Sequence, residues 1–268
     1  APIYQSGSII TPPGFDALKF FRWMEEFRPT WYTAVPTMHQ TILSRAPRNA
    51  DIIQSNPLKF IRSSSASLPS IVMENLEKVF NTCVIESYGM TEAAHQMTSN
   101  PLPPKKRKSG SVGLAAGPDV ALLYKSKIIK NDKNNRNITG HIIIKGENVT
   151  NGYINNPKAN AESFINGWFL TGDEGMFDDD GYLKITGRLK EIINRGGEKI
   201  SPKEIDEILM DHESVQQAVA FSVPHEKLGE DLFAAVVLKE NKVTNEAALK
   251  DYCKNRLTNG ISVTEKHQ

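Results

Sequence analysis

Residues 86–95, ESYGMTEAAH, combine an aromatic ring, a glycine, a hydroxyl group and carboxylates, and they end in a histidine. Tyr88 offers a flat face for stacking on a base, and Gly89 lets the backbone approach a ligand closely. Thr91 can donate to a phosphate oxygen, and Glu92 can hold a Mg²⁺ ion that also binds phosphates. A strand-to-helix turn capped by Thr91 would use the same residues, so this segment alone leaves both interpretations open.

A second group of candidate residues lies between positions 167 and 202. Asp173, which lies between glycine-rich turns, could accept both hydroxyls of a ribose, as acidic residues do in other nucleotide sites. Arg188 could reach the same sugar. Taken singly, each could be an ordinary turn aspartate or surface arginine. Together with Tyr88 and Thr91, they give the base, the ribose and the phosphate of a nucleotide one candidate partner each.

Hydrophobic periodicity in the first ninety residues predicts alternating helices and strands. Ile71, Leu76 and Val79 are expected on the apolar side of the last predicted helix. Short connections between such elements indicate a parallel sheet with crossover helices. The predicted helices are 15–29, 37–46 and 69–80, and the predicted strands are 30–35, 58–65 and 82–87.

Ligands bind outside the carboxyl ends of the strands in open α/β sheets. Residues 62–69, RSSSASLP, and residues 86–92, ESYGMTE, both follow predicted strands that could be neighbours. We therefore expect a ligand site at this edge of the sheet.

The pattern changes beyond Ser109, where short apolar runs such as SVGL, VALLY and HIIIKG alternate with Gly, Asn and Asp turns. These runs predict a small antiparallel sheet or barrel. A compact α+β module is predicted from about residue 187. Its first helix is expected to begin with a capping box, in which Ser201 is the N-cap and Glu204 is at the third helical position. The basic run at 105–108 is expected in a solvated loop.

Composition narrows the class of protein. The 268 residues are enough for two domains, and 39% hydrophobic and 24% charged residues are typical of a chain that builds a core. A net charge of +1 gives no electrostatic reason to expect nucleic acid or an anionic membrane as a partner. Two cysteines, Cys83 and Cys253, favour a reducing compartment. There is no signal-peptide pattern, and a start at Ala1 rather than methionine favours a partial sequence.

Seven motifs occur in this order along the chain: WYTAVPTMHQ, RSSSASLP, YGMTE, GENVTNGY, WFLTGDEG, GRLKEIINRGGEKISPKEID and VPHEKLGE. They resemble those of the adenylate-forming superfamily, which includes acyl-CoA synthetases, luciferases and the adenylation domains of peptide synthetases. The resemblance covers essentially the whole chain. Within the superfamily, TWYTAVPTMHQTIL, FIRSSSASL, HQMTSNPLPP and INRGGEKISP are most similar to the oxalate–CoA ligase branch.

This resemblance implies an α/β fold that is incomplete at both ends. A parallel sheet with crossover helices is followed by a small antiparallel, barrel-like subdomain and a small α+β C-terminal domain. Residues 1–187 would be the C-terminal part of the large adenylation domain, and residues 188–268 would be part of the small mobile domain.

The resemblance also implies roles for individual residues. The tyrosine of YGMTE, Tyr88, would stack on adenine, Thr91 would contact the α-phosphate, and Glu92 would hold Mg²⁺. Asp173 and Arg188 would bind the ribose. The other nucleotide-binding candidates are Ser65, Ala66, Glu86, Ser87, Gly89 and Met90.

Three further roles follow from the same resemblance. Lys190 falls at the hinge about which the small domain rotates between two half-reactions. Gly196, Gly197 and Glu198 would face the site where coenzyme A forms the thioester. Ser64 would join Ser65 and Ala66 in lining the acyl and adenine pocket.

His95 is the residue expected to recognise the acid. A small dicarboxylate needs hydrogen-bond donors for its far carboxylate, because it offers little apolar surface. Ser65 is a second candidate donor and His39 a weaker one. A histidine with a purely structural role would fit position 95 as well.

The implied function is that of an ATP-dependent acid–CoA ligase, which forms an acyl-adenylate and then a thioester, with oxalate as the favoured acid. ATP or AMP, Mg²⁺ and coenzyme A would be bound. A ligase for a medium-chain or aromatic acid, and a non-catalytic AMP-binding remnant, remain alternatives. The expected compartment is the cytoplasm or the peroxisome.

Two family features are missing from the sequence. No Ser/Thr/Gly-rich phosphate loop with its lysine is found from Ala1 onward, and the segment after Arg256 lacks the proline- and glycine-containing motif of the C-terminal lysine. Lys266 is not in a matching context. We therefore expect these 268 residues alone to be poorly active or inactive but still to bind AMP weakly. Robust ATP–pyrophosphate exchange would contradict this expectation.

Overall fold

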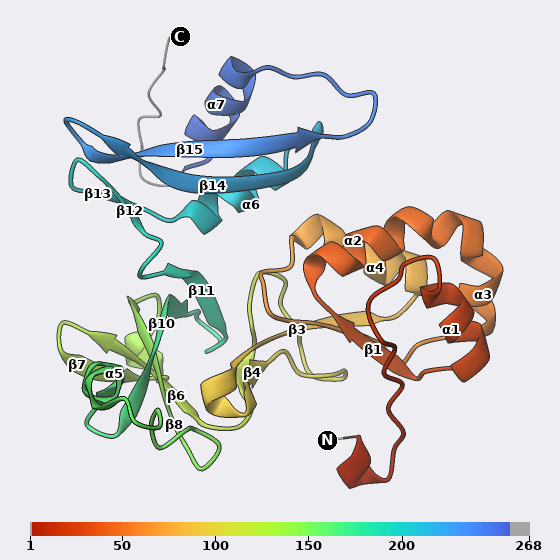
Figure 1. The fold of residues 1–268 in the computed structure, drawn as a ribbon, viewed down its shortest axis with the longest axis horizontal. Coiled ribbons are helices and arrows are strands. Elements are labelled where there is room, and N and C mark those ends of the chain that lie inside the picture. Colours follow the sequence, from red (N-terminus) through yellow and green to blue (C-terminus); the bar gives the residue numbers. More distant parts are fainter. Residues whose placement is uncertain (1, 258–268) are drawn as a thin grey trace. The chain divides into compact units, whose positions relative to one another are not determined.

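Helices and strands alternate at the start of the chain, as the sequence predicts (Figure 1). The computed structural model describes residues 2–257. Their contacts divide them into two units. The first unit comprises the residues up to Pro118 together with Glu147–Thr150, and the second comprises Asp119–Gly146 and the residues from Asn151 on.

The first unit is built on a five-stranded sheet in the order β1-β2-β3-β4-β5. Strands β1, β2 and β3 are parallel, whereas β4 and β5 are antiparallel to their neighbours. The parallel part of the sheet and its crossover helices are therefore confirmed. The elements are η1 (Ile3–Gln5), α1 (Phe20–Phe27), β1 (Trp31–Ala34), α2 (Pro36–Arg45), η2 (Ala46–Asn49), α3 (Ala50–Ser55), β2 (Phe60–Ser63), α4 (Ser70–Phe80), β3 (Cys83–Met90), η3 (Thr91–Ala93), β4 (His95–Ser99) and β5 (Leu114–Ala115).

Helix α4 buries a different face from the predicted one. Leu76 is fully buried, but Ile71 is 44% exposed and Val79 is 38% exposed. Successive residues of a helix are about 100° apart, so Ile71 lies about 140° round the helix from Leu76 and cannot share its face. The core side of α4 carries Val72, Met73, Leu76 and Phe80 instead.

The second unit begins with an antiparallel half-barrel whose main strands run in the order β11-β10-β8-β6-β7. The predicted antiparallel subdomain is confirmed. The SVGL segment is an exception, because β5 pairs with β4 in the sheet of the first unit. The elements are β6 (Asp119–Tyr124), β7 (Lys127–Lys130), η4 (Lys133–Asn135), β8 (Thr139–Lys145), α5 (Pro157–Ser163), β9 (Phe164–Ile165), β10 (Trp168–Phe177) and β11 (Leu183–Arg188).

The last part of the second unit is a four-stranded sheet in the order β13-β12-β15-β14. Side chains from both of its helices join one core cluster with the sheet, including Ile205, Leu209 and Cys253. The elements are β12 (Ile193–Arg195), β13 (Glu198–Ile200), α6 (Pro202–Met210), β14 (Val215–His225), β15 (Gly229–Leu238) and α7 (Glu246–Lys254). The predicted α+β module is therefore present.

The capping box predicted for α6 is not formed. Ser201 is the N-cap residue, but its side chain makes no capping hydrogen bond. Its hydroxyl instead donates to the backbone oxygen of Thr186 on β11 at 2.7 Å. The hydroxyl therefore ties the start of α6 to the half-barrel. The domain boundary predicted between residues 187 and 188 falls at the end of β11 and stays a prediction.

No helix within residues 2–257 has both the length and the apolar character that crossing a bilayer requires.

Candidate functional site

The carboxyl end of β2 lies beside the middle of β3, with Ser63 paired to Glu86. Glu86 is 4% exposed, and its Oε1 accepts a hydrogen bond from the backbone nitrogen of Leu68 at 3.0 Å. This bond ties the loop that follows β2 to β3. The two segments that were predicted to share a sheet edge therefore do so.

The loop after β2 presents small polar side chains at this edge. Ser65 and Ala66 are exposed, and Ser65 has a φ of 75°, in the left-handed region that a non-glycine residue seldom adopts. Ser64 is buried and accepts a hydrogen bond from Arg62 Nη1 at 3.1 Å. The same guanidinium nitrogen donates to the Thr33 hydroxyl at 3.2 Å. Arg62 is a cation at this edge that the sequence analysis did not identify.

The YGMTE segment does not enter a helix. Strand β3 continues to Met90, and a single 3-10 turn then leads into the antiparallel strand β4. A Cβ atom on Gly89 would lie 1.5 Å from the backbone oxygen of His95, so only glycine fits there. Ala94 and His95 both have positive φ values, 48° and 83°. The exposed His95 is thereby folded back beside β3.

A segment distant in sequence holds this turn in place. The backbone nitrogen of Thr150 donates to the backbone oxygen of Glu92 at 2.7 Å. The side-chain amide of Asn148 donates to the backbone oxygen of Ala93 at 2.8 Å. The GENVTNGY motif was recognised only by its family likeness, and these contacts give it a structural role.

The side chains of the turn differ in exposure. Thr91 is exposed and Glu92 is half-buried, so both can be approached by a ligand. Ser87 and Tyr88 are buried, and Tyr88 is only 9% exposed. In the first unit, the ring of Tyr88 therefore offers little surface for stacking on a base.

The second unit brings Asp173 and Arg188 together as a cross-strand pair of β10 and β11. Arg188 Nε donates to Asp173 Oδ1 at 2.9 Å. The carboxylate side chain is 8% exposed, whereas the side chain of Arg188 is 61% exposed. The two residues predicted to bind the ribose are therefore in contact with each other.

The remaining predicted residues of the second unit lie in exposed turns. Lys190 is in the turn between β11 and β12. Gly196 and Gly197 form the tip of the β12–β13 hairpin, with φ values of 60° and 98°, and Glu198 follows them. The nitrogen of Gly196 donates to the backbone oxygen of Leu228 at 2.9 Å.

Glu92 is a suitable ligand for Mg²⁺, because a carboxylate oxygen is a hard donor. Within the described residues, no three His, Cys, Asp or Glu side chains form a group that could hold a metal ion. A Mg²⁺ ion at Glu92 would therefore depend on further oxygen ligands such as those of a bound phosphate.

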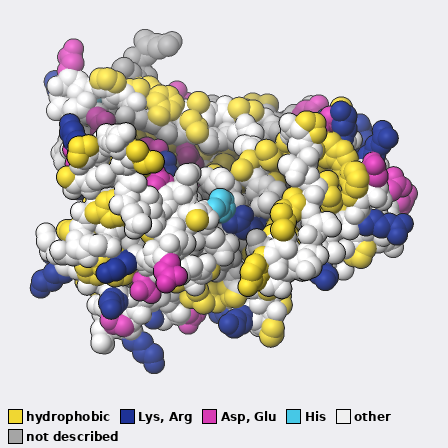
Figure 2. Space-filling view, turned by 60° about the horizontal axis from the view of Figure 1, so that its bottom comes forward, with side chains coloured by type: hydrophobic (Ala, Val, Ile, Leu, Met, Phe, Trp, Pro, Cys, Tyr) yellow, Lys and Arg dark blue, Asp and Glu magenta, His cyan; other side chains and the backbone are white. Residues whose placement is uncertain are grey.

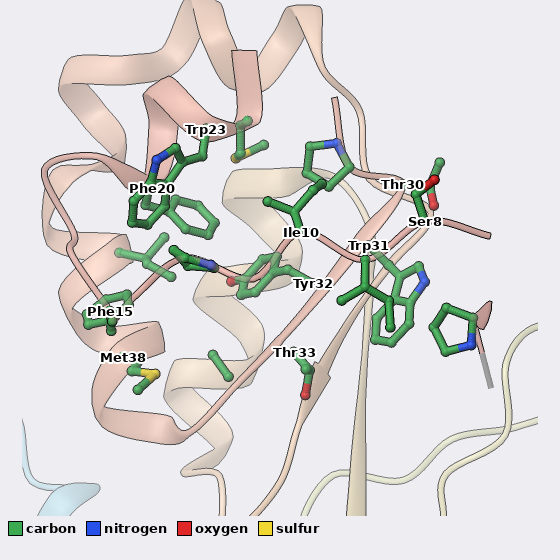
Figure 3. Close-up of a pocket in the computed structure, with 18 residues that line it drawn as sticks. Ser8, Ile10, Phe15, Phe20, Trp23, Thr30, Trp31, Tyr32, Thr33 and Met38 are labelled. Atoms are coloured by element: carbon green, nitrogen blue, oxygen red, sulfur yellow. The ribbon is translucent and has the colours of Figure 1, made fainter. Parts of the chain in front are cut away.

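The first unit also contains a cavity of about 610 Å³ beside β1 (Figure 3). Its lining is mainly apolar and includes Ile10, Phe15, Phe20 and Trp31. Residues 8–15 run across β1 at this place (Figure 3). The cavity also includes Thr33 and Ala34, so it reaches the carboxyl end of β1.

Charges of both signs are scattered over the face shown in Figure 2. Within the basic run, Arg107 Nη2 and Glu77 Oε1 form an ion pair at 2.6 Å. The run at 105–108 thus contributes to the structure of the first unit through Arg107.

Comparison with known proteins gives this geometry a context. A model of the family described as "AMP-binding enzyme" matches residues 1–154. A model described as "AMP-binding enzyme C-terminal domain" matches residues 204–264. The first match covers the candidate residues up to Ile154, and the second covers β14 and β15 of the C-terminal sheet.

Two curated relatives are oxalate–CoA ligases. The protein from Arabidopsis thaliana is 47% identical over 256 residues, which cover 94% of this chain and 49% of the relative. The protein from Saccharomyces cerevisiae is 43% identical over 257 residues, which cover 94% of this chain and 45% of the relative. The chain spans about half the length of the curated relatives it matches.

A solved structure shares the fold over most of the chain. The ATP-bound MatB protein from Rhodopseudomonas palustris superposes with a TM-score of 0.83 at 30% sequence identity. The match covers 94% of this chain and 49% of that protein.

Proposed function

Because this chain belongs to the family of AMP-binding, adenylate-forming enzymes, we propose that it carries the nucleotide-facing and thioester-forming parts of an ATP-dependent acid–CoA ligase. The observation that carries the proposal is the preassembled pair of Asp173 and Arg188, together with the exposed Thr91 in the glycine-dependent turn. These groups suit a ribose and a phosphate respectively.

The reaction has two steps. The carboxylate of the acid attacks the α-phosphate of ATP and expels pyrophosphate, which leaves an acyl-adenylate. The thiol of coenzyme A then attacks the acyl carbon, giving the thioester and AMP. Donors and cations must offset the negative charge that moves to the leaving group in the first step.

The residues of the first unit would bind the reacting end of the nucleotide. Thr91 would donate to the α-phosphate, and Glu92 would hold Mg²⁺, whose charge offsets that of the phosphates when it is bound. Tyr88 is only 9% exposed, so stacking on the adenine ring requires that more of its own ring become accessible. Glu86 would act by fixing the loop of Ser65.

The residues of the second unit would bind the sugar and the thiol substrate. Asp173 would accept hydrogen bonds from the ribose hydroxyls, and Arg188 would keep the carboxylate oriented. Rotation about Lys190 would bring the hairpin of Gly196, Gly197 and Glu198 to the acyl-adenylate for the second step.

Oxalate is the acid that the polar edge of the first sheet suits best. The exposed His95 and Ser65 can donate to a second carboxylate, and the neighbouring cation Arg62 adds favourable charge. His39 is fully buried and its Nδ1 lies 3.2 Å from the Tyr32 hydroxyl, so we assign it a structural role.

The test measures AMP release by the complete gene product that carries this sequence, with ATP, Mg²⁺ and coenzyme A. The panel contains oxalate, a longer dicarboxylic acid, a medium-chain fatty acid and an aromatic acid. We expect oxalate to be preferred. His95→Ala should reduce kcat/KM for oxalate about tenfold or more, since a hydrogen bond to a charged group is worth about 1.5–3 kcal/mol. The KM for ATP should change little.

The apolar cavity beside β1 favours a second candidate, a ligase for a medium-chain or aromatic acid. Preference for such an acid, with His95→Ala as active as the wild type, would support this candidate and contradict the role of His95. AMP binding without AMP release from any acid would favour a non-catalytic AMP-binding protein instead.

A further inference from the structure

His141 on β8 contacts the turn that carries Asp173. The backbone nitrogen of Gly172 donates to His141 Nε2 at 2.8 Å. An imidazole nitrogen accepts a hydrogen bond only while it carries no proton, so Nε2 is unprotonated here. Burial lowers the pKa of His141, although the charge of Asp173 acts in the opposite direction. The unprotonated ring is therefore the form present at neutral pH.

The turn needs this support because the strand ladder is interrupted there. The register between β8 and β10 shifts between Leu170 and Glu174, so residues 171–173 lack regular pairing with β8. Gly172 has a φ of 83°, and its nitrogen bonds to the His141 ring. The backbone nitrogen of Asp173 bonds to the Thr171 hydroxyl at 3.1 Å. The side chains of His141 and Thr171 thus accept the backbone hydrogen bonds of Gly172 and Asp173 in place of a neighbouring strand.

We propose that His141 is a positioning residue for nucleotide binding, because its unprotonated Nε2 holds the Gly172 amide and so sets the carboxylate of Asp173 for the ribose. The inference rests on the proposed function, since it takes Asp173 as the ribose ligand. Protonation turns Nε2 into a donor that faces a second donor, so the bond to Gly172 is lost. Because burial lowers the pKa of His141, nucleotide affinity falls only at pH values below the ordinary histidine pKa of about 6.5.

The charged groups around His141 also favour a loss of nucleotide affinity when the ring is protonated. Asp173 and Glu174 face it from β10, and Arg188 of β11 is paired to Asp173 at 2.9 Å. Strand β6 places the apolar Leu123 opposite His141. A protonated ring would attract the Asp173 carboxylate in competition with Arg188. The carboxylate would be drawn away from the orientation that Arg188 gives it.

The test measures AMP affinity by calorimetry between about pH 5.5 and 8, using the complete gene product. Wild type is compared with His141→Gln and His141→Leu. The glutamine carbonyl can accept from Gly172 but does not titrate, so its affinity at pH 8 should match wild type within about twofold. Leucine removes the acceptor and should weaken AMP binding about fivefold to tenfold at every pH.

The decisive quantity is the ratio of the wild-type and His141→Gln dissociation constants at each pH. The phosphate of AMP titrates equally with both proteins, so a ratio that rises toward low pH reports His141 alone. A ratio that stays constant would overturn the inference, even if the leucine variant fails to fold.

Asp173→Ala separates this outcome from failure of the proposed function. If wild type binds no AMP, or if Asp173→Ala binds it as tightly as wild type, the proposed ribose ligand is wrong and the inference fails with it. If Asp173→Ala loses affinity while the pH ratio stays constant, only the inference about His141 fails.

Discussion

His39 is a buried histidine that should make the stability of the first unit depend on acidic pH. It is fully buried, and burial lowers its pKa to about 4, although backbone groups of Ala34 and Arg62 oppose the shift. The folded-state pKa is therefore below the unfolded value of about 6.5, and the unfolded chain takes up the proton first as the pH falls. The free energy of unfolding is unaffected by this group above about pH 6.5 and falls by up to about 3 kcal/mol by pH 4.

His39→Asn should remove this acid-dependent loss, because asparagine does not titrate. Urea denaturation at several pH values from neutral to about pH 4.5 measures the slope of the free energy of unfolding against pH. Tyr32→Phe is the matched control, since it removes the hydroxyl beside Nδ1 but keeps the imidazole. The control should lose some stability at every pH and keep the wild-type slope. Equal slopes for wild type and His39→Asn would show that another group is responsible.

Single residues of the site could be predicted only where a motif identifies them. Asp173 and Arg188 were each predicted to bind the ribose, which stays a prediction, and the structure pairs Arg188 Nε with Asp173 Oδ1 at 2.9 Å. Gly89 was predicted to permit close approach of a ligand, but the close approach in the structure is to the backbone of His95. Arg62 begins the RSSSASLP motif but was assigned no role, and His141 belongs to no motif. Their contacts depend on strand register, which a single sequence does not define well enough.

The β12–β13 hairpin depends on a buried ion pair next to its tip. Arg195 Nε donates to Asp231 Oδ1 at 2.8 Å, and the two side chains are 9% and 12% exposed. Burial alone would raise the pKa of Asp231, but hydrogen bonds from Arg195 and from the Leu232 amide hold it below its usual range. Because Arg195 directly precedes Gly196, the ion pair anchors the hairpin whose tip would face coenzyme A.

Arg195→Met should cost about 3 kcal/mol, because it leaves the Asp231 carboxylate buried without its partner. The double variant Arg195→Met, Asp231→Leu should recover most of this loss, since two apolar side chains can pack in place of the pair. Urea denaturation of the three proteins gives the comparison. If the double variant is as unstable as the single one, the ion pair itself stabilises the hairpin and the argument from desolvation is wrong.

The presence of helices and strands could be predicted better than the buried face of a helix or the hydrogen bonds at its ends. The alternation of helix and strand patterns gave the parallel sheet correctly, because periodicity reflects burial directly. The α4 face was wrong because Ile71 and Val79 are apolar residues that the helix exposes. The capping box was wrong because Ser201 finds a partner on another strand, at Thr186. Such long-range partners override local sequence preference and cannot be read from a short segment.

At the scale of the whole molecule, the two candidate groups belong to different units. Thr91 and His95 lie in the first unit, and Asp173 and Arg188 lie in the second. The proposed two-step reaction adds a change of arrangement at Lys190, which lies in an exposed turn after β11.

Lys190→Pro tests that change of arrangement. Proline fixes its own φ near −65° and restricts the residue before it, so a backbone rotation at position 190 becomes costly. The two half-reactions are measured separately in the complete gene product that carries this sequence. ATP–pyrophosphate exchange reports the adenylation step, and transfer of a preformed acyl-adenylate to coenzyme A reports the thioester step. We expect exchange to persist and the thioester step to slow by roughly tenfold or more.

Lys190→Ala shows whether the backbone or the amine matters. Alanine removes the ammonium group and leaves φ and ψ free, so both half-reactions should proceed at close to the wild-type rate. If alanine slows the thioester step as much as proline does, the amine itself takes part and the hinge is elsewhere. If proline slows both steps equally, position 190 matters for the folded arrangement rather than for rotation. Rotation about Lys190 predicts that only the proline variant is slow, and only in the thioester step. This is because rotation is needed between the two steps, whereas the amine is absent from the alanine variant in both.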